Sequence, residues 1–91
     1  MITVTEDDQA PIDPRGDRLV YEVIAERISR RIASGELAPG MPLPSEPDLA
    51  EWYGVSRASV RRAREVLEER GLVRVVPGKG TYVSRGEPTE P

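Results

Sequence analysis

The sequence predicts a small, mainly α-helical domain that ends in a β-hairpin. Three stretches, residues 18–34, 45–53 and 56–70, carry apolar residues at helical spacing and are separated by glycines and prolines. After residue 71 the pattern changes to two short runs of β-branched and aromatic residues around a tight turn. A chain of 91 residues is long enough for one such domain.

The ends of the chain differ from this central part. Residues 1–17 are polar and acidic, contain Pro11 and Pro14, and show no sustained periodicity. Residues 85–91 are again rich in proline and glutamate. We therefore expect a disordered acidic arm at 1–17, a folded domain at 18–84 and a disordered tail at 85–91.

The composition excludes several kinds of site. The chain has no cysteine and no histidine, so it lacks disulfides, thiolate metal ligands and the commonest general base. Glu65, Glu68 and Glu69 alternate with arginines as helical ion-pair partners do. We expect no cofactor, no metal and no enzyme activity. Without a long apolar run or a leader, we expect no membrane contact and a place in the cytosol.

The first predicted helix covers residues 18–34, with Asp17 as its N-cap and Gly35 at its end. Glu26 and Arg30 can form an ion pair on its exposed side, at a spacing of four residues. Its buried stripe consists of Tyr21, Ile24, Ile28 and Ile32.

The second predicted helix begins after the extended Pro42-Leu43-Pro44 segment, from which Leu43 is expected to enter the core. Ser45 can cap this helix by accepting a hydrogen bond from the Asp48 N–H, and Pro47 is tolerated in its first turn. Gly54 ends the helix. Its inward-facing residues are Leu49, Ala50 and Tyr53.

The third predicted helix, residues 56–70, begins at the N-cap Ser56 and is followed by Gly71. One face is apolar and consists of Val60, Ala63 and Leu67; another is basic and consists of Arg57, Arg61 and Arg64. A helix that packs by an apolar stripe and shows guanidinium groups elsewhere suits the major groove of DNA. The alternative is an arginine-rich face that only contacts solvent.

The charge distribution favours the DNA interpretation. The net charge of the chain is −3, but residues 56–85 contain eight basic and three acidic residues, a net charge of +5. The positive charge is therefore concentrated where a phosphate backbone would lie.

The predicted hairpin directly follows the arginine-rich helix. Its turn is Pro77-Gly78-Lys79-Gly80. Lys79 and Arg74 could reach phosphates or the minor groove from such a position, so that helix and hairpin would flank one duplex. The alternative is a hairpin that only covers the core.

Several motifs in this order resemble the winged helix-turn-helix domain of GntR-type bacterial transcription regulators. The resemblance covers about residues 19–84. The motifs are Ile32-Ala33-Ser34-Gly35-Glu36-Leu37-Ala38-Pro39-Gly40, Leu43-Pro44-Ser45-Glu46, Leu49-Ala50, Gly54-Val55-Ser56-Arg57, Val60-Arg61, Leu67-Glu68, Gly71-Leu72-Val73 and Gly78-Lys79-Gly80-Thr81-Tyr82-Val83.

This resemblance implies three helices with a two- or three-stranded sheet, and a regulator, usually a repressor, that binds a palindromic operator in double-stranded DNA. Helix 56–70 would enter the major groove, and the 74–83 hairpin would be the wing. Arg57 and Arg61 match positions that contact operator bases and backbone, Ser59 a position that meets phosphate, and Gly78 the wing tip in the minor groove. The expected DNA-binding residues are Ser45, Ser56, Arg57, Ser59, Arg61, Arg64, Arg74, Gly78 and Lys79.

Three features depart from the family pattern. Pro47 stands where an arginine often touches DNA, so one contact is expected to be missing. Arg64 stands where an aliphatic residue is common; it could contact phosphate or extend along the edge of the core. Only eight residues follow Val83, so we expect no small-molecule effector domain and, at most, a homodimer that forms on DNA.

A protein–protein interaction or dimerisation module with only non-specific DNA binding is the alternative function. Trp52 lies beside the core residue Tyr53 on a side of the second helix that its periodicity leaves exposed. An exposed tryptophan can be the central contact of an interface.

Overall fold

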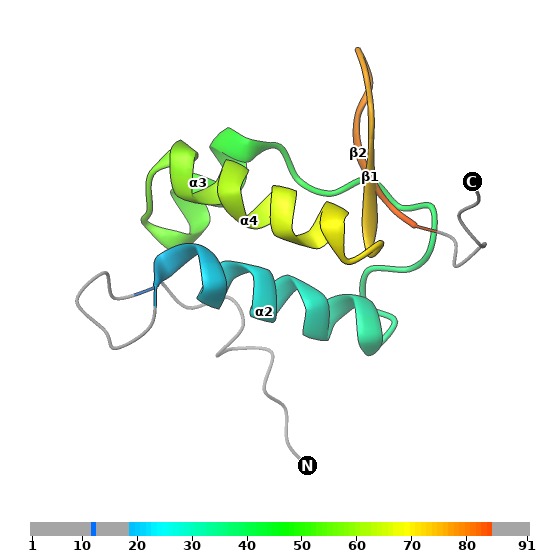
Figure 1. Ribbon diagram of the computed structural model, residues 1–91, viewed down its shortest axis with the longest axis horizontal. Coiled ribbons are helices and arrows are strands. Elements are labelled where there is room, and N and C mark those ends of the chain that lie inside the picture. The colour runs from blue at the N-terminus through cyan, green and yellow to red at the C-terminus, as the bar shows by residue number, and fades with distance from the viewer. Residues whose placement is uncertain (1–11, 13–18, 85–91) are drawn as a thin grey trace.

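The structure is a computed structural model that describes residue 12 and residues 19–84. Within these residues it contains the helices α2 (Val20–Ala33), α3 (Glu46–Tyr53) and α4 (Arg57–Glu69), followed by the strands β1 (Val73–Val76) and β2 (Gly80–Val83) (Figure 1). Three helices followed by an antiparallel hairpin confirm the predicted fold class.

Helix α4 is the centre of the domain. In Figure 1, α2 runs beneath α4, α3 lies at the N-terminal end of α4, and the hairpin stands at its C-terminal end and projects away from α2. The apolar stripe of α4 is buried, as predicted, and faces both other helices. The central residues of the core are Ile24, Ala25, Ile28, Leu49, Ala50, Tyr53, Val60, Ala63, Leu67 and Val73.

Helix α2 begins later than predicted. Leu19 takes the N-cap position without a side-chain hydrogen bond, so the expected start at residue 18 with Asp17 as cap is wrong. Asp17 itself lies outside the described residues. Glu26 and Arg30 form the expected ion pair, with 3.6 Å between Oε2 and Nη2.

Both ends of α3 follow the prediction. The Asp48 N–H donates to Ser45 Oγ at 3.2 Å, which caps the helix despite Pro47 in its first turn. Gly54 has a φ of 69°, a left-handed conformation that lets the chain turn directly into the start of α4.

The ends of α4 are also set by local sequence. Ser56 Oγ accepts from the Ser59 N–H at 3.1 Å. Gly71 has a φ of 76° and donates to the Glu68 carbonyl, and Leu72 donates to the Leu67 carbonyl, both at 3.0 Å. This left-handed ending sends the chain into β1 without an unpaired helix end.

The hairpin is attached to the segment between α2 and α3. Val73 pairs with Val83 and Val76 with Gly80, so the hairpin begins at residue 73, one residue before the expected start. On the other edge of β2, Pro42 forms a bridge with Tyr82. The Leu43 N–H donates to the Thr81 carbonyl, and the Val83 N–H to the Met41 carbonyl, both at 2.8 Å. A very short third strand therefore fixes the wing to the helices.

Ile12 departs from the expected acidic arm. Its side chain is buried in the core, and its N–H donates to the Tyr53 carbonyl at 3.0 Å. Residue 12 therefore does not belong to the expected disordered acidic arm; one apolar residue without periodic neighbours gives no sequence signal for such a contact. The rest of residues 1–17, and residues 85–91, lie outside the described part. None of the helices in the described part is long and apolar enough to cross a lipid bilayer.

Candidate nucleic-acid interface

The exposed face of α4 carries Arg57 and Arg61. Within residues 19–84 no acidic side chain pairs with Arg57, which lies in the first turn of the helix. Arg61 lies one turn further along and its side chain is 54% exposed. Its Nη2 lies 3.3 Å from Oε1 of Glu46, the first residue of α3. Of these two arginines, only Arg61 contacts Glu46, so their environments differ.

Arg64 lies at the edge between the exposed face and the core. Its side chain is only 21% exposed. Arg64 Nε donates to Oε2 of Glu46 at 3.2 Å, and its Nη1 lies 3.6 Å from Oε1 of Glu68. Two acids hold this guanidinium against the protein, so of the two expected positions Arg64 takes the one along the core edge.

A groove of about 380 Å³ lies between α3, α4 and the wing on one face. Its polar lining residues include Ser45 and Glu46 at the start of α3, Arg64 of α4 and Lys79 of the hairpin turn. Its apolar floor includes Ile28, Leu43, Leu49, Val60 and Leu67. Residues separated by more than thirty positions in the sequence are therefore placed around one surface.

The wing brings its two basic residues together. Arg74 and Lys79 line a hollow of about 260 Å³ with Gly40, Val76 and Tyr82. Gly78, at the turn, has a φ of 78° and open space around its Cα, so the backbone there is free to approach a ligand closely. The turn is closed by the Lys79 N–H, which donates to the Val76 carbonyl at 2.9 Å.

The two helix N-termini are not equally suited to phosphate. At α4, Ser56 Oγ takes the Ser59 N–H, which leaves the N–H groups of Arg57 and Ala58, and no acid lies in this first turn. The first turn of α3 contains Glu46, Pro47 and Asp48. Two carboxylates and the missing proline N–H make α3 the weaker anion site.

Ser59 lies away from the arginine face of α4. Its hydroxyl accepts from the Ser56 hydroxyl at 3.1 Å. The same two residues share the capping hydrogen bond, so the structure uses Ser59 to close the first turn of the helix.

Sequence reasoning assigned no role to Glu46. Its partners Arg61 and Arg64 are 15 and 18 residues away, so no local spacing indicates these contacts. The only available signal was its place in the first turn of a predicted helix, within the Leu43-Pro44-Ser45-Glu46 motif.

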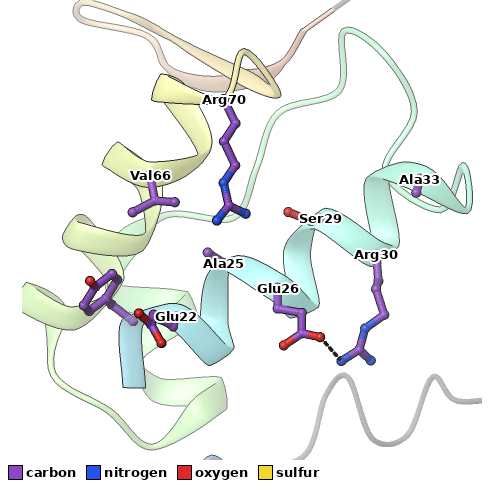
Figure 2. Close-up of a pocket in the computed structure, with 9 residues that line it drawn as sticks. Glu22, Ala25, Glu26, Ser29, Arg30, Ala33, Val66 and Arg70 are labelled. Carbon is purple, nitrogen blue, oxygen red and sulfur yellow. Dashed lines mark ion pairs between the residues drawn. The ribbon is translucent and has the colours of Figure 1, made fainter. Parts of the chain in front are cut away.

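The opposite side of the domain also carries a hollow, of about 650 Å³, between α2 and the C-terminal half of α4 (Figure 2). Figure 2 shows Arg70 extending from the end of α4 towards α2, and the Glu26–Arg30 ion pair along α2. The charged residues that line this hollow are Glu22, Glu26, Arg30 and Arg70, and none of the predicted DNA-binding residues lines it. Among the described residues no cluster of acids suits a metal ion.

Arg62 of α4 contacts α2 through Tyr21, a residue that lines the same hollow. Its guanidinium lies 5.1 Å from the centre of the Tyr21 ring, and its Nη1 lies 3.4 Å from Oε1 of Glu65. Tyr21 and, to a lesser degree, Glu65 raise the pKa of Arg62. Arg62 therefore differs from the arginines of the exposed face in contacting another helix through an aromatic ring.

Comparison with known proteins places the chain in a family. The model of the family described as bacterial regulatory proteins, gntR family, matches residues 20–83. The HTH-type transcriptional repressor NagR of Bacillus subtilis is 46% identical over 66 residues, which are 72% of this chain and 27% of NagR. The mannosyl-D-glycerate transport/metabolism system repressor MngR of Escherichia coli is 46% identical over 68 residues, which are 75% of this chain and 28% of MngR.

A third relative, the Glc operon transcriptional activator of Escherichia coli, is 43% identical over 68 residues, which are 75% of this chain and 27% of the activator. The chain thus spans little more than a quarter of the length of these relatives.

Solved structures agree with the sequence relatives. AraR(DBD) in complex with operator ORX1 superposes with a TM-score of 0.76 at 31% identity, covering 82% of this chain and 94% of that one. YtrA from Sulfolobus acidocaldarius, a GntR-family transcription factor, superposes with a TM-score of 0.72 at 38% identity, covering 84% and 79%. The chain therefore belongs to the GntR family of bacterial regulatory proteins.

Proposed function

We propose that this chain is the DNA-binding part of a transcription regulator, with α4 in the major groove of double-stranded DNA and the β1–β2 hairpin as a wing beside it. The observation that carries the proposal is the shared face: Val60, Arg64 and Leu67 of α4, the start of α3 and the wing turn all border one groove, and Arg61 contacts Glu46 at its wall. Two of the relatives above are named repressors and one an activator. We favour repression, by occupation of an operator.

The residues on this face support distinct roles. Arg57 and Arg61 are exposed on α4, where a planar guanidinium can donate two hydrogen bonds to a guanine edge. The Arg57 and Ala58 N–H groups support a phosphate contact at the helix end. Arg74 and Lys79 supply positive charge on the wing, and Gly78 allows close approach to the minor groove.

The remaining predicted residues support the interface less directly. Ser45 and Ser56 cap the two helices, and Ser59 shares the second cap. Arg64 is held by two carboxylates, so its role is to shape the groove wall, with at most a weakened attraction for phosphate. The proposal includes no enzyme activity and no cofactor, and it places the protein at the bacterial nucleoid in the cytoplasm.

A palindromic operator and a homodimer on DNA complete the proposal. One winged domain reads one half-site, and two domains related by a two-fold axis read two half-sites one helical turn or more apart. The structural neighbour AraR(DBD), solved in complex with operator ORX1, supports operator binding by a domain of this fold.

The test begins with selection of duplexes from a random-sequence pool by the wild-type chain. Enriched duplexes are then titrated as single and paired half-sites at two salt concentrations, against a scrambled duplex. Specific binding that is much tighter on paired than on single half-sites is the expected result. No enriched sequence, together with equal and steeply salt-dependent binding to every duplex, would contradict the proposal.

The alternative role as an interaction module is favoured by Trp52, whose side chain lies on α3 with 51% of the residue exposed. Under this alternative, Trp52→Ala would abolish self-association in sedimentation experiments. Arg57→Ala and Arg61→Ala would leave self-association unchanged. Under the proposed function, the two arginine substitutions reduce DNA binding and Trp52→Ala leaves single-site binding unchanged.

A further inference from the structure

One carboxylate lies among the basic residues of the proposed DNA face. Glu46 Oε1 lies 3.3 Å from Arg61 Nη2, and Glu46 Oε2 lies 3.2 Å from Arg64 Nε. Each oxygen therefore holds a different arginine, so the carboxylate connects two successive turns of α4 to the first turn of α3.

The exposure of the three side chains shows which arginine is left available. Glu46 is 27% exposed and Arg64 only 21%, whereas Arg61 is 54% exposed. Glu46 and Arg64 thus form a mostly buried ion pair at the groove wall. The Arg61 side chain extends from this pair towards solvent. A guanidinium has five N–H donors, so one hydrogen bond to Glu46 leaves enough donors for a bidentate contact with a guanine.

An acid at this place reduces the general attraction of the face for DNA. Non-specific binding depends on the number of phosphates that positive side chains neutralise, and a carboxylate on the same face opposes it. The Arg61 side of the Glu46–Arg61 pair is exposed, and exposed ion pairs add little to stability, in most cases less than about 1 kcal/mol. A contribution to folding therefore does not explain the contact between Glu46 and Arg61.

We propose that Glu46 is a positioning residue that sets DNA specificity by holding the Arg61 guanidinium in its base-contacting direction and away from neighbouring phosphates. This inference rests on the proposed function. Arg57 has no such partner among the described residues, so no other helix holds its guanidinium in one direction as Glu46 holds that of Arg61.

The experiment compares five variants, among them Arg61→Ala alone and Arg61→Ala with Glu46→Gln, on two duplexes: the one selected by the wild-type chain and a scrambled one of equal length. Glu46→Gln removes the charge at equal size, and Glu46→Asp keeps the charge but shortens its reach. Arg61→Ala is combined with Glu46→Gln to test whether Glu46 acts through Arg61. Glu65→Gln is the matched control, because it removes the same charge from α4 beside Arg62.

We expect Glu46→Gln to tighten binding to the scrambled duplex a few-fold and to lower the specificity ratio by about tenfold, since part of a base contact is lost. Glu46→Asp should lower the ratio by about threefold or more with no change in net charge. With Arg61 already replaced by alanine, Glu46→Gln should change the ratio by less than about twofold. Glu65→Gln should leave the ratio unchanged.

Three results would overturn the inference. The specificity ratio could be unchanged in Glu46→Gln, Glu46→Gln could lower it as much in the Arg61→Ala background as in the wild type, or Glu65→Gln could lower it as much as Glu46→Gln does. The second would mean that Glu46 contacts DNA itself. Thermal unfolding of each variant separates these effects from a fold defect, since a stability loss lowers binding to both duplexes together. A wild-type chain without any specificity contradicts the proposed function instead, so the two failures are distinguishable.

Discussion

Arg61 and Arg57 lie one turn apart on the same helix, but their surroundings differ. Glu46 restrains Arg61, while Arg57 lies beside the free N–H groups at the start of α4. Helical spacing places both on one face and cannot show this difference, because the restraint comes from another helix.

Arg61→Ala should weaken binding to the selected duplex by about 1–3 kcal/mol, the usual contribution of a bidentate arginine–guanine contact. The loss should be small on a scrambled duplex. A fluorescence-anisotropy titration at fixed salt measures both, and an unchanged affinity for the selected duplex would remove Arg61 from the base-contacting set.

Lys79→Ala should act differently, because the wing lysine is proposed to neutralise a phosphate. Binding should weaken by the same factor on selected and scrambled duplexes, and the slope of log K against log salt should fall by about one. Titrations at four or more salt concentrations give this slope. A loss confined to the selected duplex would instead assign Lys79 to a base.

Helix ends were the part of the fold that the sequence predicted most directly. Ser45, Ser56, Gly54 and Gly71 act where their chemistry requires, because capping and left-handed turns involve residues only a few positions apart. The start of α2 was not predicted, because Leu19 caps it without a side-chain hydrogen bond and thus leaves no polar signal.

Ser56→Ala should lower the free energy of unfolding by about 1 kcal/mol, because α4 would lose the acceptor for the Ser59 N–H. Urea unfolding measures the change. Ser56→Asn, which keeps an acceptor at the N-cap, should restore most of the loss. If alanine and asparagine destabilise equally, the cap contributes nothing measurable to α4.

Contacts between elements could not be predicted in the same way. The pattern indicated which residues of α4 are basic, but their partners Glu46 and Tyr21 lie on α3 and α2. Pairing of Pro42 with Tyr82 likewise joins segments forty residues apart. Such contacts follow from the packing of three helices around α4, which periodicity alone does not specify.

The core of the domain extends beyond its predicted boundary through Ile12. Ile12→Ala should lower the free energy of unfolding by about 2 kcal/mol or more, as expected for truncation of a buried isoleucine. Leu19→Ala, at a residue that is 58% exposed, is the control and should change stability far less. An equal free energy of unfolding for Ile12→Ala and the wild type would mean that Ile12 does not contribute to the core.

The bridge between the α2–α3 segment and β2 has a consequence for how DNA is chosen. Because β2 pairs with β1 on one edge and with residues 40–43 on the other, the wing is tied to the α2–α3 segment, and we expect the distance between α4 and the wing to be set before any duplex is met. The duplex must then adapt its groove width and bending to the protein. The energy of that deformation depends on base sequence. Under the proposed placement of α4 in the major groove and the wing in the minor groove, we therefore expect the untouched base pairs between them to contribute to selectivity.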